Sequence, residues 1–588
     1  MRRLAAIVAV CLTIGSSLSA CSGASGRTPV RGGTLNMLGT GDVDYMDPNV
    51  SYYTTGYLGL RMWSRQLLTY PAVAGRTTNP VPDLATQVPS RSNGGVSSNG
   101  LTYKLTIRPG AMWNTSPPRQ VTGHDVVRGV ERTCNPAQPF GGLADFETLI
   151  AGMQAFCDGF AKVSPTVAAI KGFLASNSVP GIRVDSANPL SVTFTLTRPA
   201  TYFPNLLAIP ALSPAPVEFL NYVPASPDLA QHTVSDGPYE ILSYTPAKSI
   251  VFVRNRAWNG ETDPARKAYV DRIVVSETET QQQVEQQLST NSPGADMGWD
   301  SPIPTASVPA FLAAKNPRLT LGPTFGTDPF LLFDTASPNN GGALRKVKVR
   351  QTLEYGINRS ELIRAAGGPQ VAPPLTHVLP PGVVGSKPAD PYPYDPAKAR
   401  RMLRSDGTPS LRLKVLYQAN LDFEARMFQI IQSELGKVGV SVTGVANNSS
   451  DFYTKYLEVP AVAHNGTWDL ALAQWVPDWY GNAAFSFFFP LFAGPGSFPP
   501  QGSNFGFYDD PTTNKLIHEA ASTTSVSKAG SLWAQADRQV MADAVIYPIT
   551  SPAVPVYHAA QVHNAVFVPD LFQFDPTNVW LTPGRNGG

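Results

Sequence analysis

The sequence has few charges of either sign, and this scarcity limits the partners of the protein. Charged residues make up 15% of the 588 residues, and the formal net charge is only +2. Proteins that hold nucleic acid carry basic runs or stripes, and the sequence contains no such run. We therefore expect no nucleic acid, and a small neutral or zwitterionic molecule as the partner.

Long apolar runs are also missing, although a helix that spans a bilayer needs about 20 apolar residues. The N-terminal run from Leu4 to Leu18 is too short. The densest later stretch, residues 483–492, is interrupted by Ser486 and Pro490. The sequence therefore predicts no membrane-spanning helix.

The short N-terminal run instead has the pattern of a secretory signal. Two arginines precede it, and it ends in Leu18-Ser19-Ala20-Cys21. This ending resembles the bacterial lipobox, in which the cysteine thiol receives a diacylglycerol that holds the mature protein at the membrane. We expect residues 1–20 to be a signal peptide, Cys21 to be the lipid anchor, and residues 21–32 to form a flexible tether. A plain signal peptide with a chance cysteine is the alternative.

Only four cysteines occur, at positions 11, 21, 134 and 157. The first leaves with the signal and the second carries the lipid. Cys134 and Cys157 then form the one remaining pair in an oxidising compartment, so we expect a disulfide between them. A zinc site is the weaker interpretation, because no histidine nearby completes the ligand set.

Catalytic motifs are absent from the sequence as well. None of the seven histidines forms an HExxH pattern, and the sequence has neither a G-x-S-x-G elbow nor a phosphate-binding P-loop. The adjacent carboxylates Asp509 and Asp510 stand in a turn-like Tyr-Asp-Asp-Pro segment, which favours a solvated loop. We expect no catalytic residue, no metal site and no cofactor, although histidine ligands for nickel or haem stay open.

Hydrophobic periodicity predicts a mixed α/β protein. Strands are expected at residues 33–38, 101–107, 191–197, 249–254, 270–276, 330–333, 411–417 and 440–443. Helices are expected at residues 57–68, 122–132, 278–290, 347–365, 395–403, 424–438 and 528–543. Thr122 and Asp395 are the expected N-caps of two of these helices, and residues 256–266 are expected to form a polar loop. The strand–helix–strand order over residues 411–443 indicates an α/β domain.

Several motifs follow one another in a characteristic order. They are Gly33-Thr34-Leu35, Tyr45-Met46-Asp47-Pro48, the Gly-Leu-Thr-Tyr segment that leads to Trp113, Val121-Thr122-Gly123-His124-Asp125-Val126, Ser235-Asp236-Gly237-Pro238-Tyr239, Tyr394-Asp395-Pro396 and Trp475-Val476-Pro477-Asp478-Trp479-Tyr480. In this order they resemble the family 5 extracellular solute-binding proteins, the peptide, dipeptide and nickel receptors of ABC importers. The resemblance runs from about residue 33 to residue 564. One departure is the Asn-Thr-Ser-Pro-Pro turn after Trp113, where the family usually has Ser-Asp-Gly.

The resemblance implies a two-lobed periplasmic-binding-protein-like fold of type II, cluster C, with an additional domain on one lobe. It implies that a ligand is engulfed when the lobes close around a hinge. The expected division places lobe I at residues 33–80, 200–315 and 545–588, the additional domain at 81–199, and lobe II at 316–544.

The resemblance also implies a ligand site at Asp478, which is the family position that accepts the α-ammonium of a peptide. Trp475, Trp479 and Tyr480 flank it and could form apolar walls. The alternative is an aspartate that caps a helix while the aromatic residues pack in the core. Oligopeptide receptors carry an arginine six residues earlier, where this sequence has Leu472. Other candidates border the cleft in relatives: Tyr45, Met46, Asp47, Phe325 and Tyr239.

These observations predict a monomeric, lipid-anchored receptor on the outer face of the cell membrane. It would deliver peptides or peptide-like solutes to an ABC permease driven by cytoplasmic ATPases. Two alternatives stay open. The same scaffold could bind a siderophore, metal chelate, haem, glycan or lipid precursor, or the chain could be a non-transport scaffold of the cell envelope.

Overall fold

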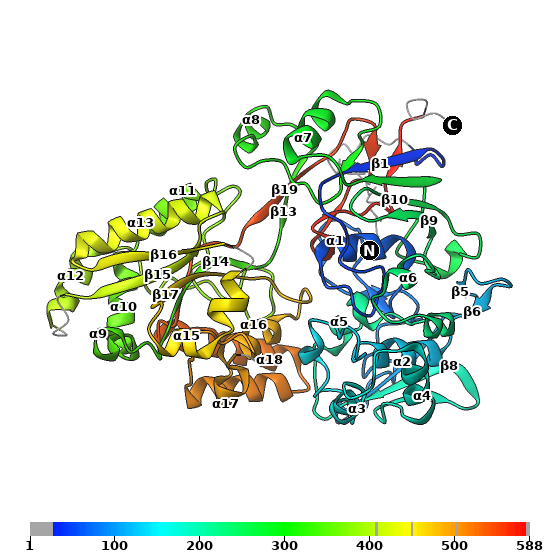
Figure 1. Cartoon of the computed structure of the whole chain (residues 1–588), viewed down its shortest axis with the longest axis horizontal. Coiled ribbons are helices and arrows are strands. Elements are labelled where there is room, and N and C mark those ends of the chain that lie inside the picture. The colour runs from blue at the N-terminus through cyan, green and yellow to red at the C-terminus, as the bar shows by residue number, and fades with distance from the viewer. Residues whose placement is uncertain (1–27, 406–409, 449–450, 500–501, 584–588) are drawn as a thin grey trace, which may run out of the picture.

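The computed structural model describes residues 28–405, 410–448, 451–499 and 502–583. In these residues the chain forms two bodies, and each body is built on a five-stranded mixed sheet. A pair of strands that runs from one body to the other joins them (Figure 1). None of the helices in the described ranges is both long enough and apolar enough to cross a membrane. The predicted signal peptide and Cys21 lie outside the described residues, so those predictions stay predictions.

The sheet of the first body combines segments that are far apart in the sequence. Its strand order is β12-β1-β11-β10-β9, with β1 parallel to both β11 and β12. The strands are β1 (Thr34–Leu38), β9 (Tyr239–Thr245), β10 (Ser249–Arg254), β11 (Arg272–Ser276) and β12 (Met297–Gly298). Leu35 and Met37 on β1 are fully buried. The first strand of the chain is therefore held between strands that follow it by more than 200 residues.

Helix α1 (Thr54–Trp63) packs on this sheet and on the turn Pro569–Leu571. The prediction of a helix at residues 57–68 is correct in type, but the observed helix ends at Trp63, five residues earlier than predicted. The chain leaves the helix at Ser64 in an extended conformation. It leaves because β2 (Leu68–Thr69) pairs with β3 (Val81–Pro82), so strand pairing outweighs the helical periodicity of this segment.

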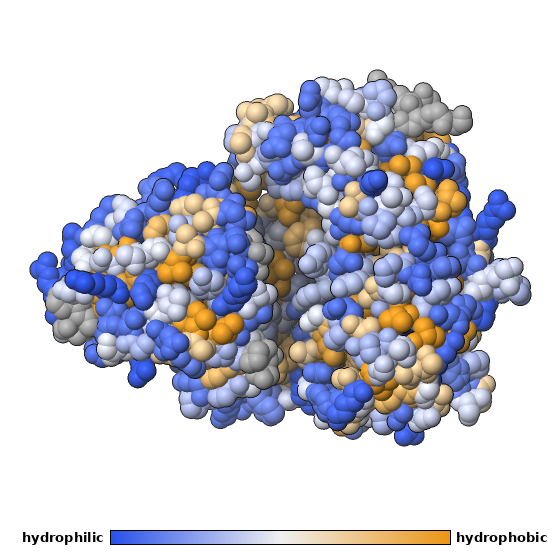
Figure 2. Space-filling view, viewed as in Figure 1, coloured by the Kyte–Doolittle hydropathy of each residue, from blue (hydrophilic) through white to orange (hydrophobic). Residues whose placement is uncertain are grey.

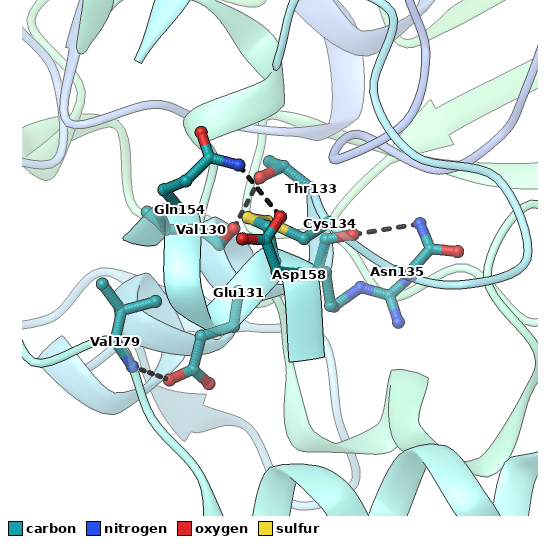
Figure 3. The surroundings of a disulfide bond; sticks show 10 residues. Val130, Glu131, Thr133, Cys134, Asn135, Gln154, Asp158 and Val179 are labelled. Atoms are coloured by element: carbon teal, nitrogen blue, oxygen red, sulfur yellow. Dashed lines mark hydrogen bonds between the residues drawn. A yellow bond between two sulfur atoms is a disulfide. The ribbon is translucent and has the colours of Figure 1, made fainter. Parts of the chain in front are cut away.

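A smaller sheet of order β4-β8-β7 lies below the first. Its strands are β4 (Thr102–Thr106), β7 (Ile182–Asp185) and β8 (Asn188–Thr195), and its helices are α2 (Gly123–Arg132), α3 (Met153–Phe160) and α4 (Val167–Ser176). Asp125 accepts a hydrogen bond from the backbone of Thr122 at 2.9 Å, which confirms the predicted start of α2. The predicted disulfide is present, because Cys134 just after α2 is bonded to Cys157 on α3 (Figure 3).

The sheet of the second body has the order β16-β15-β17-β14-β18. Its strands are β14 (Thr327–Phe333), β15 (Arg412–Gln418), β16 (Ser441–Asn447), β17 (Leu470–Trp475) and β18 (Ile546–Pro548). Helix α13 (Asp422–Val438) connects the parallel strands β15 and β16, which confirms the predicted strand–helix–strand unit. Helix α12 (Pro396–Ser405) begins as predicted, since Asp395 accepts a hydrogen bond from Lys398 N at 2.8 Å.

The predicted long helix over residues 347–365 is wrong in one respect, because it consists of two helices. Helix α10 (Val347–Gly356) ends at Ile357, which has an extended conformation. Asn358 then starts α11 (Arg359–Ala365) by accepting a hydrogen bond from Ser360 N at 3.2 Å. An asparagine favours a helix start over a helix interior, so the break has a local cause.

The two bodies are joined by an antiparallel pair of strands, β13 (Leu319–Pro323) and β19 (Ala553–Tyr557) (Figure 1). The remaining helices are α5 (Phe203–Leu206), α6 (Pro227–Ala230), α7 (Gln281–Thr290), α8 (Val308–Ala313), α9 (Asn339–Gly342), α15 (Pro460–His464), α16 (Ala484–Phe492), α17 (Pro511–Ser522) and α18 (Val526–Ala542). The remaining strands are β5 (Met112–Trp113), β6 (Arg119–Gln120), β20 (Val562–His563), β21 (Phe567–Val568), β22 (Gln573–Phe574) and β23 (Trp580–Leu581).

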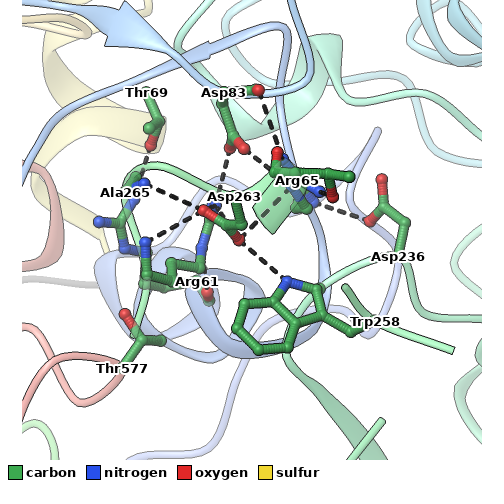
Figure 4. Close-up of polar contacts among 12 residues, drawn as sticks. Arg61, Arg65, Thr69, Asp83, Asp236, Trp258, Asp263, Ala265 and Thr577 are labelled. Carbon is green, nitrogen blue, oxygen red and sulfur yellow. Dashed lines mark hydrogen bonds and ion pairs between the residues drawn. The ribbon is translucent and has the colours of Figure 1, made fainter. Parts of the chain in front are cut away.

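The predicted polar loop at residues 256–266 carries charges that are buried. Arg266 is fully buried and pairs with Asp83 at 2.8 Å and with Asp263 at 3.3 Å. Arg65 pairs with Asp83 from the other side at 2.8 Å (Figure 4). Removing one partner of such a buried pair costs about 3–5 kcal/mol. The network therefore fixes segments of the first body that are nearly 200 residues apart.

Candidate functional site

A cavity of about 890 Å³ lies between the two bodies. The first body contributes Gly41, Asp42, residues 52–55, Tyr57, Asp300, Asp570 and Phe572 to its wall, and the second contributes Asp328, Tyr453, Glu458, residues 474–478, Tyr480, Ser503 and Phe505. Figure 2 shows the hollow between the bodies, with apolar residues in its depth. Pockets that hold small ligands measure about 300–1,000 Å³, so the cavity has the size of a ligand site.

Aromatic side chains form a large part of the cavity wall. They are Tyr52, Tyr53, Tyr57, Tyr453, Trp475, Tyr480, Phe505 and Phe572. The indole N–H of Trp475 donates to the carbonyl of Ser486 at 2.9 Å, which fixes the ring. The phenol of Tyr480 donates to the carbonyl of Pro569 at 3.1 Å and thereby connects the two bodies. These rings offer flat apolar surfaces with fixed orientations.

Asp478 lies in this wall, directly after strand β17. Its Oδ1 accepts a hydrogen bond from the phenol of Tyr52, and its Oδ2 accepts one from Ser486 Oγ at 3.0 Å. Ser486 Oγ also accepts a hydrogen bond from the backbone N–H of Asp478 at 3.0 Å. Burial raises the pKa of Asp478, and the hydrogen bonds from Tyr52 and Ser486 oppose this rise. Its carboxylate is therefore oriented by neutral donors, and no arginine or lysine in the described structure is paired with it.

Asp145, in the short segment Leu143–Asp145, is a second carboxyl group close to this position. Burial raises its pKa well above the ordinary value, and the charge of Asp478 raises it further. Its Oδ2 is buried without a hydrogen-bond partner among the described residues. The charge of Asp478 thus acts on Asp145, which belongs to the part of the chain that contains the smaller sheet, as well as on the cavity.

Two further buried carboxyl groups line the cavity. Burial raises the pKa of Asp328 to about 6. Burial also raises the pKa of Asp570 to about 7, against the opposing effect of Arg61. Both pKa values are raised because a charged carboxylate loses hydration in these positions, which favours the protonated form. A cationic group placed in the cavity would reverse this effect.

The structure brings three of the nine predicted ligand residues to the cavity: Asp478, Trp475 and Tyr480. Trp479 is fully buried behind the wall, and its ring stacks on Tyr202 at 5.4 Å between centroids. Phe325 lies behind the wall too, with its ring edge-on to Tyr480 at 5.9 Å.

The other four predicted residues lie away from this cavity. Tyr45, Met46 and Asp47 border a separate pocket of about 180 Å³, and Asp47 is fully buried in an ion pair with Arg132. Tyr239 is in the core of the first body, where its phenol donates to the carbonyl of Val270 at 3.0 Å.

Sequence reasoning missed Tyr52, Asp328 and Asp570, which also line the cavity. The adjacent aromatic residues Tyr52 and Tyr53 were the signal that the sequence offered for this segment. Asp328 and Asp570 gave no signal, because each reaches the wall only through the tertiary fold. Among the described residues, no three histidine, cysteine or carboxylate side chains are grouped as metal ligands.

Comparisons with known proteins agree on one family and one fold. The model for "Bacterial extracellular solute-binding proteins, family 5 Middle" matches residues 79–497. The glutathione-binding protein GsiB of Salmonella typhimurium is 24% identical over 492 residues, which cover 82% of this chain and 84% of that protein. GsiB of Pectobacterium atrosepticum is 29% identical over 240 residues, which cover 40% of this chain and 44% of that protein.

Solved structures with the same fold include two binding proteins. Clavulanic acid biosynthesis oligopeptide binding protein 2 superposes with a TM-score of 0.81 at 23% identity, covering 94% of this chain and 96% of that one. The unliganded open form of the periplasmic murein tripeptide binding protein MppA superposes with a TM-score of 0.72 at 18% identity, covering 95% and 99%. These similarities confirm the predicted two-lobed fold.

Proposed function

Because the chain belongs to the family 5 bacterial extracellular solute-binding proteins, we propose that it is the receptor of an ABC importer for peptides or peptide-like solutes. Membership in this family makes the chain a solute-binding protein and not an enzyme. The observation that supports a peptide ligand is the position of Asp478 in an aromatic-walled cavity between the two bodies. The proposed role is capture and delivery, without bond chemistry.

The proposed mechanism is closure of the two bodies around the solute. The pair of strands β13 and β19 is the proposed hinge, because it joins the two sheets. A solute that contacts both walls stabilises the closed form by its differential affinity for that form. The proposed lobes are those expected from the sequence, with residues 81–199 as the additional domain, except that β18 at residues 546–548 pairs with β14 and therefore belongs to the second body and not to lobe I.

Asp478 is the proposed partner of the peptide α-ammonium group. A charge-assisted hydrogen bond in a partly desolvated cavity is among the stronger polar contacts. Trp475 and Tyr480 would pack on the peptide backbone, and Phe325 would support the ring of Tyr480 from behind.

The proposed location is the outer face of the cell membrane, where acyl chains on Cys21 would hold the mature protein. Replacement of Cys21 by serine tests this anchor. The Cys21→Ser variant should lose incorporation of labelled fatty acid and appear in the medium or the soluble envelope fraction. Equal labelling of the variant and the parent would exclude Cys21 as the anchor.

A thermal-shift screen tests the peptide function directly. The protein lacking residues 1–21 is mixed with pools of peptides of two to five residues, with single amino acids and sugars as controls. Glutathione, the solute in the printed name of the GsiB relatives, belongs in the screen as a peptide-like probe. We expect peptide pools to raise the melting temperature and the controls to leave it unchanged. Stabilisation by a control class alone would contradict the proposal.

A further inference from the structure

The charged residues that line the cavity are all acidic. Six carboxyl groups border it: Asp42, Asp300, Asp328, Glu458, Asp478 and Asp570. No lysine, arginine or histidine is among the described residues of its wall. In the whole sequence, by contrast, 45 lysines and arginines outnumber 43 aspartates and glutamates. The cavity therefore has a charge that differs sharply from that of the chain as a whole.

The six carboxyl groups are divided between the two bodies. Asp42 follows β1 and Asp300 follows β12, both in the sheet of the first body, and Asp570 lies in the turn against α1. Asp328 lies on β14 and Asp478 follows β17 in the sheet of the second body, and Glu458 follows the helical turn Phe452–Leu457 of the same body. Closure around the hinge would therefore bring negative charges toward one another from opposite walls.

Neighbouring groups orient these carboxylates but do not neutralise them. Asp300 accepts hydrogen bonds from the backbone N–H of Thr40 at 2.9 Å and of Gly41 at 2.6 Å. Asp42 likewise accepts from Ala247 N at 2.7 Å and from the phenol of Tyr244 at 3.0 Å. All of these donors are neutral, so none of them offsets the charge of an ionised carboxylate.

The cation that lowers the pKa of Asp570 is Arg61, and it is already paired with another carboxylate. Arg61 is buried, and its guanidinium pairs with Asp575 at 2.7 Å and donates to Thr69 Oγ1 at 2.6 Å. It lies outside the residues that line the cavity. Arg61 is thus held by Asp575 and Thr69 and adds no cationic side chain to the described wall of the cavity.

We propose, on the basis of the receptor function above, that the preferred solutes are peptides or peptide-like molecules with at least two positive charges. Like charges on opposite walls resist closure, and the resistance grows as the distance between the walls falls. A solute with one cationic group toward each wall replaces this repulsion by attraction. The charge of the solute is therefore coupled to the closure that holds it.

A matched set of tripeptides tests this inference by calorimetric titration of the protein lacking residues 1–21. The set is Lys-Ala-Lys, the same peptide acetylated on both side-chain amines, Ala-Ala-Ala and Glu-Ala-Glu. We expect Lys-Ala-Lys to bind at least tenfold more tightly than its acetylated form, and Glu-Ala-Glu to bind most weakly. Amidation of the carboxyl end of Lys-Ala-Lys should preserve or tighten binding, because no described basic residue of the wall would hold that carboxylate.

Neutralising variants show whether the cavity carboxylates cause the preference. The double variant Asp328→Asn/Asp570→Asn removes one carboxylate from each body and leaves Asp478 intact. It should lower the affinity for Lys-Ala-Lys by fivefold or more and change the affinity for Ala-Ala-Ala by less than twofold. Glu519→Gln on the exposed face of α17 is the control and should change neither value.

The outcomes separate the inference from the function on which it rests. Equal affinity for all the tripeptides, or tighter binding of Glu-Ala-Glu, would overturn the charge preference while supporting a peptide receptor. A double variant that keeps the full preference for Lys-Ala-Lys would overturn the role of the cavity carboxylates. No binding of any tripeptide, together with no stabilisation by the longer peptide pools, would overturn the receptor function itself.

Discussion

The phenol of Tyr52 donates a hydrogen bond to Oδ1 of Asp478, so a residue of the first body contacts a residue of the second in the wall of the cavity. The ring of Tyr52 packs edge-on against Phe140 at 5.2 Å, which holds the phenol in place. Ser486 is the second side-chain donor to the carboxylate. Asp478 is thus positioned by neutral groups while its charge stays available for a cation.

Replacing Asp478 by asparagine should remove most of the affinity for peptides with a free N-terminus. A hydrogen bond to a charged group contributes about 1.5–3 kcal/mol, so we expect a loss of roughly 10- to 100-fold in Kd. Calorimetric titration with a tripeptide and with its Nα-acetylated form measures the effect. The acetylated form should bind the parent and the variant with similar weak affinity. If Asp478→Asn binds the free peptide as the parent does, the ammonium of the ligand is held elsewhere.

Replacing Tyr52 by phenylalanine should affect stability more than binding. The variant loses one hydrogen bond to a buried carboxylate, which corresponds to about 1–2 kcal/mol of unfolding free energy. Peptide affinity should stay within about threefold of the parent, because Asp478 keeps its charge and its bond from Ser486. Urea unfolding and calorimetry on the same preparation measure both quantities. A loss of affinity as large as that of Asp478→Asn would instead make Tyr52 a direct ligand contact.

The affinity for cationic peptides should rise with pH between about 5 and 8. Burial raises the pKa of Asp328 to about 6 and that of Asp570 to about 7, so both carboxyl groups carry protons at pH 5. A cation binds the ionised form and lowers both pKa values, so binding releases protons and strengthens as the pH rises through these values. We expect the affinity for Lys-Ala-Lys to increase at least tenfold as the pH rises. Calorimetry in buffers of different ionisation enthalpy counts the protons.

The Asp328→Asn/Asp570→Asn variant is the control for this pH dependence. It should show a flatter pH profile and a smaller proton release, since two carboxyl groups of the cavity wall whose pKa values lie in this window are gone. An affinity that falls from about pH 5 to about pH 7 would contradict the prediction, because the amines of the peptide stay protonated over this range while the two carboxyl groups ionise.

Breaking the disulfide should lower stability without changing binding. Cys134 and Cys157 are 23 residues apart, and closing a loop of this length stabilises a fold by about 3 kcal/mol. The Cys134→Ser/Cys157→Ser variant should lose about this amount in urea unfolding, and reductant should have the same effect on the parent. Neither residue lines the cavity, so the affinity for peptides should stay unchanged. A reductant effect that persists in the double variant would point to another cause.

The local parts of the fold could be predicted from the sequence. The unit of β15, α13 and β16 follows from strand and helix periods that agree with one another over adjacent segments. The start of α12 follows from Asp395 and Pro396, because the capping carboxylate and the ring act on neighbouring backbone groups. Such elements depend on residues that are close together in the sequence.

Long-range effects could not be predicted in the same way. Arg266 belongs to a segment whose polar sequence indicates a solvated loop. It is buried in the fold, because Asp83 and Asp263 supply its counter-charges there. Residues 347–365 have one continuous helical period, yet Asn358 caps a second helix within it. In each case the outcome depends on a partner or a capping bond that periodicity does not record.

The candidate site was predictable only where one motif carries it. Trp475, Asp478 and Tyr480 reach the cavity together, since they lie in one short segment after β17. Tyr52 and Asp570 reach the same cavity from segments more than 500 residues apart, so only the folded chain brings them together. The acidic character of the whole wall is likewise a property of the tertiary structure.

Native mass spectrometry of the protein lacking residues 1–21, followed by denaturing release of what co-purifies, tests the central claim most directly. The account predicts a series of short peptides, enriched in lysine and arginine over the peptides of the host lysate, that is lost from Asp478→Asn. A single non-peptide mass bound by both the parent and Asp478→Asn would contradict it.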